Sequence, residues 1–371
     1  MNKRVLTLII SFSLAITTVF LSASIFYIVK KAQIYDTFHK TKEIPIIAHR
    51  GYSSQYMANT CEAFLAAGES KIFDGIETDI WFTKPAQNKE EDKLTFFGEE
   101  YSFQNGIPVI SHDAAPFLKD KRRINEITWK EMKYLELDQN NESVPFKNRY
   151  HHTFSWKPLE DNKLSWTEEL YSREITIDGE TQRGYQAYVI PTFVDYISIC
   201  FWKKKLPFIE IKQNSLDFED KTNGFEEGKI KLLSDEQLKD LVNIIKKFNI
   251  VEYSDLNISF LSYCNFISFR KKYLDSLKNY CNSLQIEQPY FQVLVSPLNS
   301  LKSCYSLIDE GYSLSLMQAM INKKIIKYSH DRGKKICGWT FDFIDNALTW
   351  SLYGSLGIDA ITTDTELWLI S

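Results

Sequence analysis

Two histidines and two carboxylates stand at the ends of short apolar runs in the first third of the chain. Glu77 and Asp79 are two residues apart, so on a β-strand their side chains point to the same face. Two carboxylates on one face need a cation or a shared proton, and a hard divalent metal is the simplest answer. His49 and His112 stand on either side of this pair in the sequence, and imidazole titrates near neutrality. The pattern therefore predicts metal-assisted acid–base chemistry, for which a phosphodiester is a fitting substrate.

The chain resembles the glycerophosphodiester phosphodiesterases from about residue 46 to the C-terminus. Each shared motif is common by chance, but the ordered set is specific. The set is His49-Arg50-Gly51, Asn59-Thr60, Glu77-Thr78-Asp79, His112-Asp113, Glu210-Ile211-Lys212, Trp339-Thr340 and Gly357-Ile358-Asp359 through Thr363-Asp364. Two departures stand out: Met57-Ala58 replaces the family's usual Pro-Glu, and residues 83–106 form a longer, acidic stretch that we expect to be a surface hairpin or loop.

The resemblance implies a TIM-type (β/α)8 barrel that hydrolyses glycerophosphodiesters to glycerol 3-phosphate and an alcohol with one divalent cation, Mg²⁺ or Ca²⁺. It assigns the metal ligands Glu77, Asp79 and Glu210, the catalytic His49 and His112, the phosphate-binding Arg50 and Lys212, and a substrate contact at Trp339. Simpler interpretations stay open for three of them. Glu210 and Lys212 are also compatible with a plain ion pair, and Trp339 with an ordinary core aromatic. Which histidine is the acid and which the base is left open.

Strand-like and helix-like segments alternate along the chain, as a barrel requires. Nine segments are strand-like, one more than a barrel needs, and 312–317 is the weakest. They are 46–49, 75–80, 107–112, 206–212, 257–262, 290–295, 312–317, 335–341 and 358–363. Several of the polar residues above fall at C-terminal strand ends, where TIM-barrel sites form.

Composition supports one barrel with additions. The chain has 371 residues, of which 44% are hydrophobic, ample for a barrel of roughly 250 residues. The formal charge of −4, without a basic stripe, argues against a nucleic-acid partner. The six cysteines are dispersed, in mostly apolar surroundings and without a zinc-binding spacing, so we expect buried free thiols.

A polar insertion is predicted at about 138–190, after the third strand, over the barrel mouth. There it would contact the alcohol and set specificity. Its aromatic residues fit a small core of its own equally well. They are Phe154, Trp156, Trp166, Tyr171 and Tyr185.

The N-terminus carries a separate signal. Residues 5–29 contain no charged residue and are long enough to span a bilayer as a helix. We expect a single-pass membrane anchor at 1–31, a linker at 32–43 and the barrel at 44–371, outside the cytoplasm. A cleaved signal peptide is the alternative.

Two other functions remain open. One keeps the fold and metal but acts on lysophospholipids or sphingomyelin, as lysophospholipase D and sphingomyelinase D do. The other is a membrane-anchored barrel without turnover that binds glycerophosphoryl polymers. The sequence specifies neither the alcohol of the substrate nor the oligomeric state.

Overall fold

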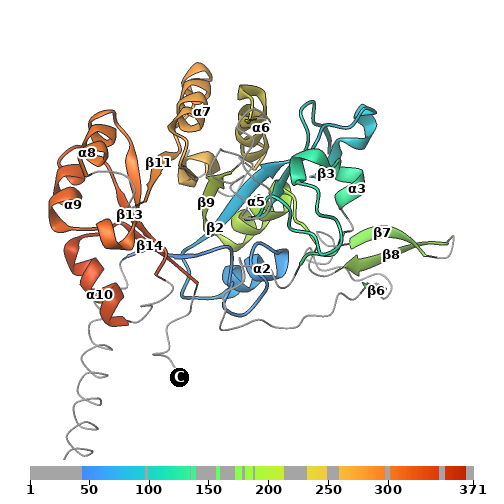
Figure 1. Ribbon diagram of the computed structural model, residues 1–371, viewed down its shortest axis with the longest axis horizontal. Coiled ribbons are helices and arrows are strands. Elements are labelled where there is room, and N and C mark those ends of the chain that lie inside the picture. Colours follow the sequence, from blue (N-terminus) through green and yellow to red (C-terminus); the bar gives the residue numbers. More distant parts are fainter. Residues whose placement is uncertain are drawn as a thin grey trace, which may run out of the picture.

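Eight parallel strands close into a barrel (Figure 1). The computed structural model describes residues 44–96, 99–133, 135–138, 156–158, 172–177, 180–186, 189–212, 232–248, 259–296, 301–341 and 347–364. The strands of the barrel are β1 (Ile46–Ala48), β2 (Gly75–Phe82), β9 (Leu206–Ile211), β10 (Asn265–Ser268), β11 (Tyr290–Val295), β12 (Ser313–Met317), β13 (Ile336–Trp339) and β14 (Ala360–Thr363). Because β1 pairs with both β2 and β14, the sheet has no free edge among these strands. The predicted TIM-type barrel is confirmed.

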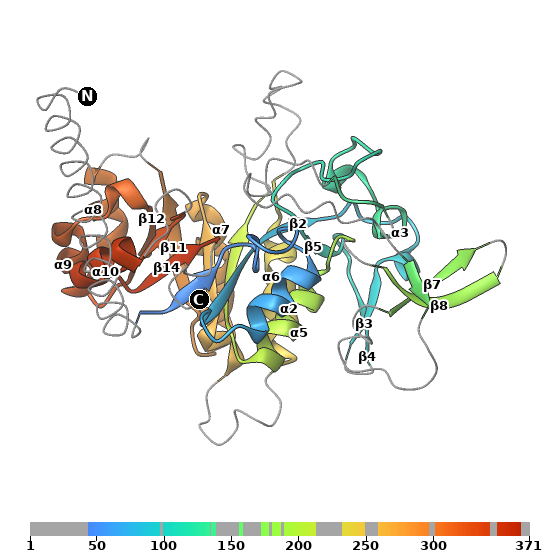
Figure 2. The same cartoon turned by 90° about the horizontal axis from the view of Figure 1, so that it is seen from below.

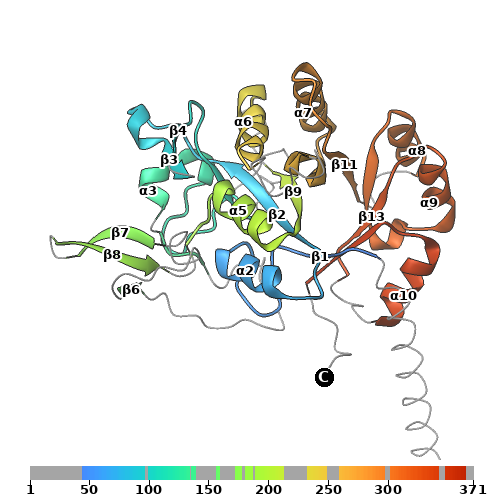
Figure 3. The same cartoon turned by 180° about the vertical axis from the view of Figure 1, so that it is seen from behind.

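Helices surround the barrel, as in a (β/α)8 fold. They are α2 (Cys61–Glu69), α5 (Phe193–Lys203), α6 (Asp235–Lys246), α7 (Lys271–Ser283), α8 (Leu301–Asp309), α9 (Lys323–His330) and α10 (Ala347–Leu356). Local sequence signals define where several begin: Thr60 caps α2, and Thr192 forms a capping box with Asp195 at the start of α5. Figure 3 shows α6 beside α7, while α2 and α5 lie together over β2.

The core has two parts. A large cluster fills the layer between the barrel and its helices, and a small one fills the barrel interior, with Ile47, Phe208, Ile267, Leu294, Cys337 and Ala360. Strand β9 shows how the sequence sorts residues between them. Phe208 belongs to the interior cluster, whereas Ile209 and Ile211 belong to the outer one. Since side chains alternate along a strand, Glu210 must point to the interior, above Phe208.

The segment between β2 and β9 carries additional elements. They are β3 (Lys93–Phe96), β4 (Glu99–Ser102), β5 (Pro108–Ile110), α3 (Trp129–Met132), β6 (Trp156–Pro158), β7 (Ser172–Ile177) and β8 (Glu180–Gln186), with short 3₁₀ turns at Lys89–Glu91 and Ile124–Glu126. Strands β3 and β4 pair antiparallel, which confirms the predicted hairpin. Strands β6, β8 and β7 form a separate sheet, and the β7–β8 pair lies at the opposite end of the molecule from α8, α9 and α10 (Figures 1 and 2).

Three strand predictions need comment. The segment 107–112 is not a barrel strand: β5 runs antiparallel to β2 outside the ring, so the insertion follows the second barrel strand, not the third. The prediction at 257–262 is also wrong where the structure describes it, because Phe260–Tyr263 forms a 3₁₀ turn capped by Ser259, and the strand begins at Asn265. The weakest prediction, 312–317, is confirmed as β12.

Other predictions fare differently. All six cysteines are buried with free thiols, as expected. The residues 5–29 and most of 138–190 lie outside the described residues. Within those that are described, no helix has the length and apolar character needed to cross a membrane.

Candidate active site

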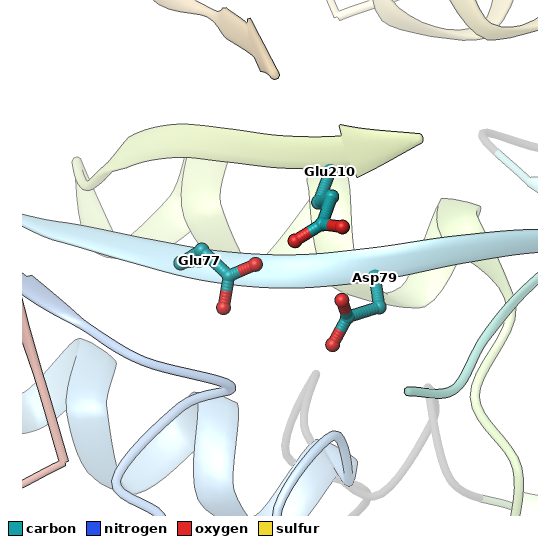
Figure 4. Close-up of side chains that lie close together, drawn as sticks. All are labelled: Glu77, Asp79 and Glu210. Carbon is teal, nitrogen blue, oxygen red and sulfur yellow. The ribbon is translucent and has the colours of Figure 1, made fainter. Parts of the chain in front are cut away.

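Three carboxylates from neighbouring strands converge inside the barrel (Figure 4). The parallel register of β2 and β9 sets Asp79 opposite Glu210, and Glu77 lies two residues before Asp79 on the same face. One oxygen from each of these three residues lies within 4.8 Å of the others. Glu77 and Asp79 are 3% and 1% exposed, so their charges are almost fully withdrawn from water. The sequence prediction that these residues form one cluster is therefore met by the geometry.

The surroundings shift the pKa values of the two carboxyls of β2 in opposite directions. Burial raises the pKa of Glu77, and the neighbouring Asp79 and Glu210 carboxylates raise it further, to well above its usual range. Burial would also raise the pKa of Asp79, but Arg50 and Lys212 outweigh this effect and lower it to about 2. Without a further cation, Asp79 is ionised at neutral pH, whereas Glu77 takes up a proton at a higher pH than an ordinary glutamate does.

Two cations border the carboxylates. Arg50 has a left-handed backbone with φ 55°, which lets its N–H donate to Glu77 Oε2 at 3.0 Å while its Nε lies 3.2 Å from Asp79 Oδ2. Lys212 Nζ lies 3.1 Å from Glu210 Oε1 and 3.7 Å from Asp79 Oδ1. The plain ion pair between Glu210 and Lys212 is thus present. A phosphate-binding role for either cation remains a prediction.

Asn59 orients Asp79, a role the sequence did not reveal. Its Nδ2 donates to Asp79 Oδ2 at 2.8 Å and its Oδ1 accepts from Thr78 Oγ1 at 3.1 Å. Like Arg50, Asn59 has a left-handed backbone, with φ 58°, a conformation that Asn tolerates better than most residues. Met57 and Ala58, which precede Asn59, are both buried. They replace the family's usual Pro-Glu, so no acidic side chain lies at this point.

The donor set fits a hard divalent cation. All three candidate ligands supply carboxylate oxygens, which Mg²⁺ and Ca²⁺ prefer. Asp79 Oδ1 is buried and has no hydrogen-bond donor among the described residues, as expected of an oxygen reserved for a metal. When all three carboxylates are ionised, Arg50 and Lys212 leave one negative charge of the cluster uncompensated, which a divalent cation would offset.

His49 enters the site from the end of β1. Its Nδ1 lies 2.7 Å from Asp364 Oδ1, which also accepts from Ser53 Oγ at 2.8 Å. Its Nε2 lies 3.9 Å from Glu77 Oε2. Asp364 thus holds the ring so that Nε2 faces the carboxylates. Thr363-Asp364 belongs to the motif set, but nothing in the sequence assigned it this contact.

His112 reaches the site by a different route. Because β5 is antiparallel to β2, its C-terminal end returns to the level of Asp79, where the Ser111 N–H donates to the Asp79 carbonyl at 3.0 Å. His112 Nδ1 lies 2.9 Å from Asp113 Oδ1. Burial lowers the pKa of His112, and the nearby Arg50 and Lys212 lower it further, so the ring is neutral at pH 7.

Trp339 lies at the C-terminal end of β13. Its Nε1 donates to the Ser315 carbonyl at 2.9 Å, and its ring packs edge-on against Phe269 with centroids 5.7 Å apart. It also contacts the apolar cluster inside the barrel. These contacts fit the core interpretation, and a substrate contact remains a prediction.

Comparison with known proteins identifies the fold and the family. The model of the glycerophosphoryl diester phosphodiesterase family matches residues 104–366, more than half of the chain. That stretch contains His112 and Glu210 but begins after His49, Glu77 and Asp79, which the structure brings to the same site. A comparison with curated proteins finds no match.

Solved structures share the fold at low identity. A Silicibacter pomeroyi protein assigned to the glycerophosphoryl diester phosphodiesterases is 14% identical, with TM-score 0.53, over 86% of this chain and 90% of that one. An Oleispira antarctica phosphodiesterase in complex with the product sn-glycerol-3-phosphate is 18% identical, with TM-score 0.52, over 86% and 92% of the two chains. A Galdieria sulphuraria protein assigned to the glycerophosphodiester phosphodiesterases is 16% identical, with TM-score 0.52, over 86% and 94%.

Proposed function

Since the chain belongs to the glycerophosphoryl diester phosphodiesterase family, a family of phosphoric diester hydrolases, we propose that it hydrolyses glycerophosphodiesters to glycerol 3-phosphate and an alcohol. The observation that carries this proposal is the buried cluster of Glu77, Asp79 and Glu210 beside two histidines. The product bound to the Oleispira antarctica relative supports glycerol 3-phosphate as the product here.

Glu77, Asp79 and Glu210 hold one divalent cation, Mg²⁺ or Ca²⁺, in this proposal. When bound, the cation supplies positive charge to the phosphoryl oxygens as negative charge builds up on them. Arg50 and Lys212 add fixed positive charge at the same place, and the guanidinium can meet two phosphate oxygens at once. Trp339 contributes an apolar wall at the barrel mouth, against which the glycerol carbons pack.

The two histidines divide the proton transfers. His112 is neutral and contacts Asp113 through Nδ1, so its Nε2 is free to accept the proton of the attacking glycerol hydroxyl. That hydroxyl forms a bond to phosphorus, and the bond to the leaving alcohol breaks. His49 is held by Asp364 through Nδ1 with its Nε2 directed toward Glu77, and it is the donor that protonates the leaving oxygen. Water then opens the cyclic phosphate to glycerol 3-phosphate.

Phosphorus NMR on the full-length chain in detergent tests this proposal. Glycerophosphocholine, glycerophosphoethanolamine and glycerophosphoglycerol should each yield glycerol 3-phosphate, and a cyclic phosphate should appear early. Preference for lysophosphatidylcholine or sphingomyelin would favour the lysophospholipase D or sphingomyelinase D alternative. Binding of glycerophosphoryl polymers without any product would favour the non-catalytic alternative and contradict the proposal.

We further propose that residues 5–29 anchor the barrel in a membrane as a single-pass helix, with the barrel outside the cytoplasm. The length and uncharged character of that run support this proposal. The protein should stay with membranes after a carbonate wash and begin at Met1. A mature N-terminus near Ile25 would instead indicate a cleaved signal peptide.

The insertion at about 138–190 is proposed to set the preference among alcohols. It lies between α3, which follows His112 in the chain, and α5, which packs against β2 and β9. Deleting residues 140–185 should alter relative rates among glycerophosphodiesters more than divalent-ion binding, because the proposed ligands lie outside it. Unchanged relative rates would remove this role.

A further inference from the structure

One buried tyrosine lies between the two strands that supply all three carboxylates. Tyr196 belongs to α5, outside the barrel, and is 0% exposed. Its hydroxyl donates to the Ile76 carbonyl of β2 at 2.7 Å and accepts from the Phe208 N–H of β9 at 3.0 Å. In the parallel register these two backbone groups lie opposite each other, so the hydroxyl bridges the strands where their own hydrogen bond is expected.

This bridge lies one peptide away from the cluster of three carboxylates. Ile76 immediately precedes Glu77, and Phe208 is the register partner of Glu77. Glu210 follows Phe208 by two residues on the same strand face. A change in the spacing of β2 and β9 at the hydroxyl therefore changes the distances from the Glu210 carboxylate to those of Glu77 and Asp79.

The same helix also fixes the strand that carries His112. Pro191, just before the Thr192 cap of α5, accepts the Ile110 N–H of β5 at 2.9 Å. Helix α5 thus contacts β2, β5 and β9. Through the Tyr196 hydroxyl, α5 makes hydrogen bonds directly with β2 and β9, the strands that carry the carboxylates.

We propose that Tyr196 is a positioning residue for the metal site: its hydroxyl sets the separation of β2 and β9 at which three carboxylates can share one divalent cation. This inference rests on the metal site of the proposed function. Losing the hydroxyl removes its hydrogen bonds to both strands without removing any ligand, so metal binding should weaken while the ligands remain in place.

The test measures Mn²⁺ binding directly, by electron paramagnetic resonance of the free ion, in the full chain with Tyr196→Phe. We expect the dissociation constant for Mn²⁺ to rise about tenfold, because the free energy of a tenfold change is similar to the contribution of one hydrogen bond. At saturating metal, kcat should return to within about threefold of wild type. A kcat that stays low at saturating metal would contradict a role in metal positioning.

Tyr273→Phe is the matched control. Tyr273 is also buried, at 2% exposed, and its hydroxyl also accepts a backbone N–H, that of Leu233 at 3.1 Å, but it lies on α7. Tyr273→Phe should lower the melting temperature as Tyr196→Phe does, yet leave Mn²⁺ binding unchanged. Equal Mn²⁺ binding by both variants and wild type would overturn the inference, and absence of Mn²⁺ binding by wild type would instead contradict the proposed metal site.

A second variant covers the case in which Tyr196→Phe does not fold. Tyr196→4-aminophenylalanine keeps a donor to the Ile76 carbonyl, but its amino group is a poor acceptor for the Phe208 N–H. One of the two strand contacts is weakened, so we expect Mn²⁺ binding to weaken about two- to threefold. Unchanged Mn²⁺ binding in this variant would then overturn the inference.

Discussion

His49 Nδ1 lies 2.7 Å from Asp364 Oδ1, although 315 residues separate the two in the sequence. Each residue follows directly after a barrel strand, His49 after β1 and Asp364 after β14. The contact is possible because β1 pairs with β14 in parallel, so the ends of the first and last strands meet when the barrel closes. Closure of the barrel therefore completes the orientation of His49, the histidine that we propose as a proton donor.

Asp364→Asn should lower kcat by about 10- to 100-fold, because the His49 ring loses the acceptor that fixes its tautomer and orientation. Steady-state kinetics and Mn²⁺ binding check this, and binding should stay within about twofold of wild type. Asp359→Asn is a matched control on the same strand region. Asp359 Oδ2 contacts His330 Nε2 at 2.8 Å before β14 begins, away from the site. If both variants lose activity equally, the His49–Asp364 contact has no special role.

The His49 and His112 variants should differ in kcat when the leaving group of the substrate is varied. His112→Ala should lower kcat at least about 100-fold on every substrate, because the attacking hydroxyl always needs a base. His49→Ala should be equally slow on glycerophosphocholine but within about tenfold of wild type on a glycerophosphodiester of p-nitrophenol, whose leaving group needs no proton. The reverse pattern would exchange the two roles, and wild-type turnover in either variant would make that histidine structural.

Divalent-ion binding should strengthen as the pH rises. Because burial and the neighbouring carboxylates raise the pKa of Glu77, protons compete with a cation for this carboxylate over a wider pH range than at an ordinary glutamate. The dissociation constant should fall with rising pH until Glu77 is ionised without the metal, and then level off. Calorimetry in buffers of different ionisation enthalpy measures the released proton directly. A pH-independent dissociation constant with no proton released would show that Glu77 is already ionised in the metal-free site.

Gly106 should resist substitution. It has φ +88°, and an added Cβ would lie 2.1 Å from the Thr83 carbonyl oxygen, where the chain turns into β5. Gly106→Ala should lower the free energy of unfolding by about 3 kcal/mol or more, from backbone strain and forced displacement together. Gly333→Ala is the control: its φ is +65°, but nothing lies within 4 Å of the added Cβ, so only the strain of about 1 kcal/mol applies. Urea unfolding measures both, and equal losses would show that the Thr83 contact adds no cost.

Residue types and spacing predicted the parts of the site that lie on regular strands. Glu77 and Asp79 are two apart on a buried strand, so strand periodicity predicted that they share one face, whereas Glu210 joined them through the resemblance to the family. His112 was assigned to a barrel strand because its apolar run looks like the others. Direction along a sheet depends on pairing partners, which a short run such as 107–112 does not encode.

Contacts between distant segments could not be predicted from the sequence either, because they too depend on which strands pair. The contacts of Asp364, Asn59 and Tyr196 depend on which strands become neighbours, and on a left-handed backbone at Arg50 and Asn59, neither of which is a glycine. Likewise Asn265, a poor strand former by propensity, begins β10 because it pairs between β9 and β11.

Metal content and turnover, measured on the same samples, test the central claim most directly. Chain stripped with EDTA should release no glycerol 3-phosphate from glycerophosphocholine, and adding Mg²⁺ or Ca²⁺ should restore turnover as one ion binds per chain. Glu210→Gln should lose both the ion and at least about 100-fold of the turnover, because one of the three carboxylates is gone. Full turnover by stripped chain that holds no ion would contradict the account.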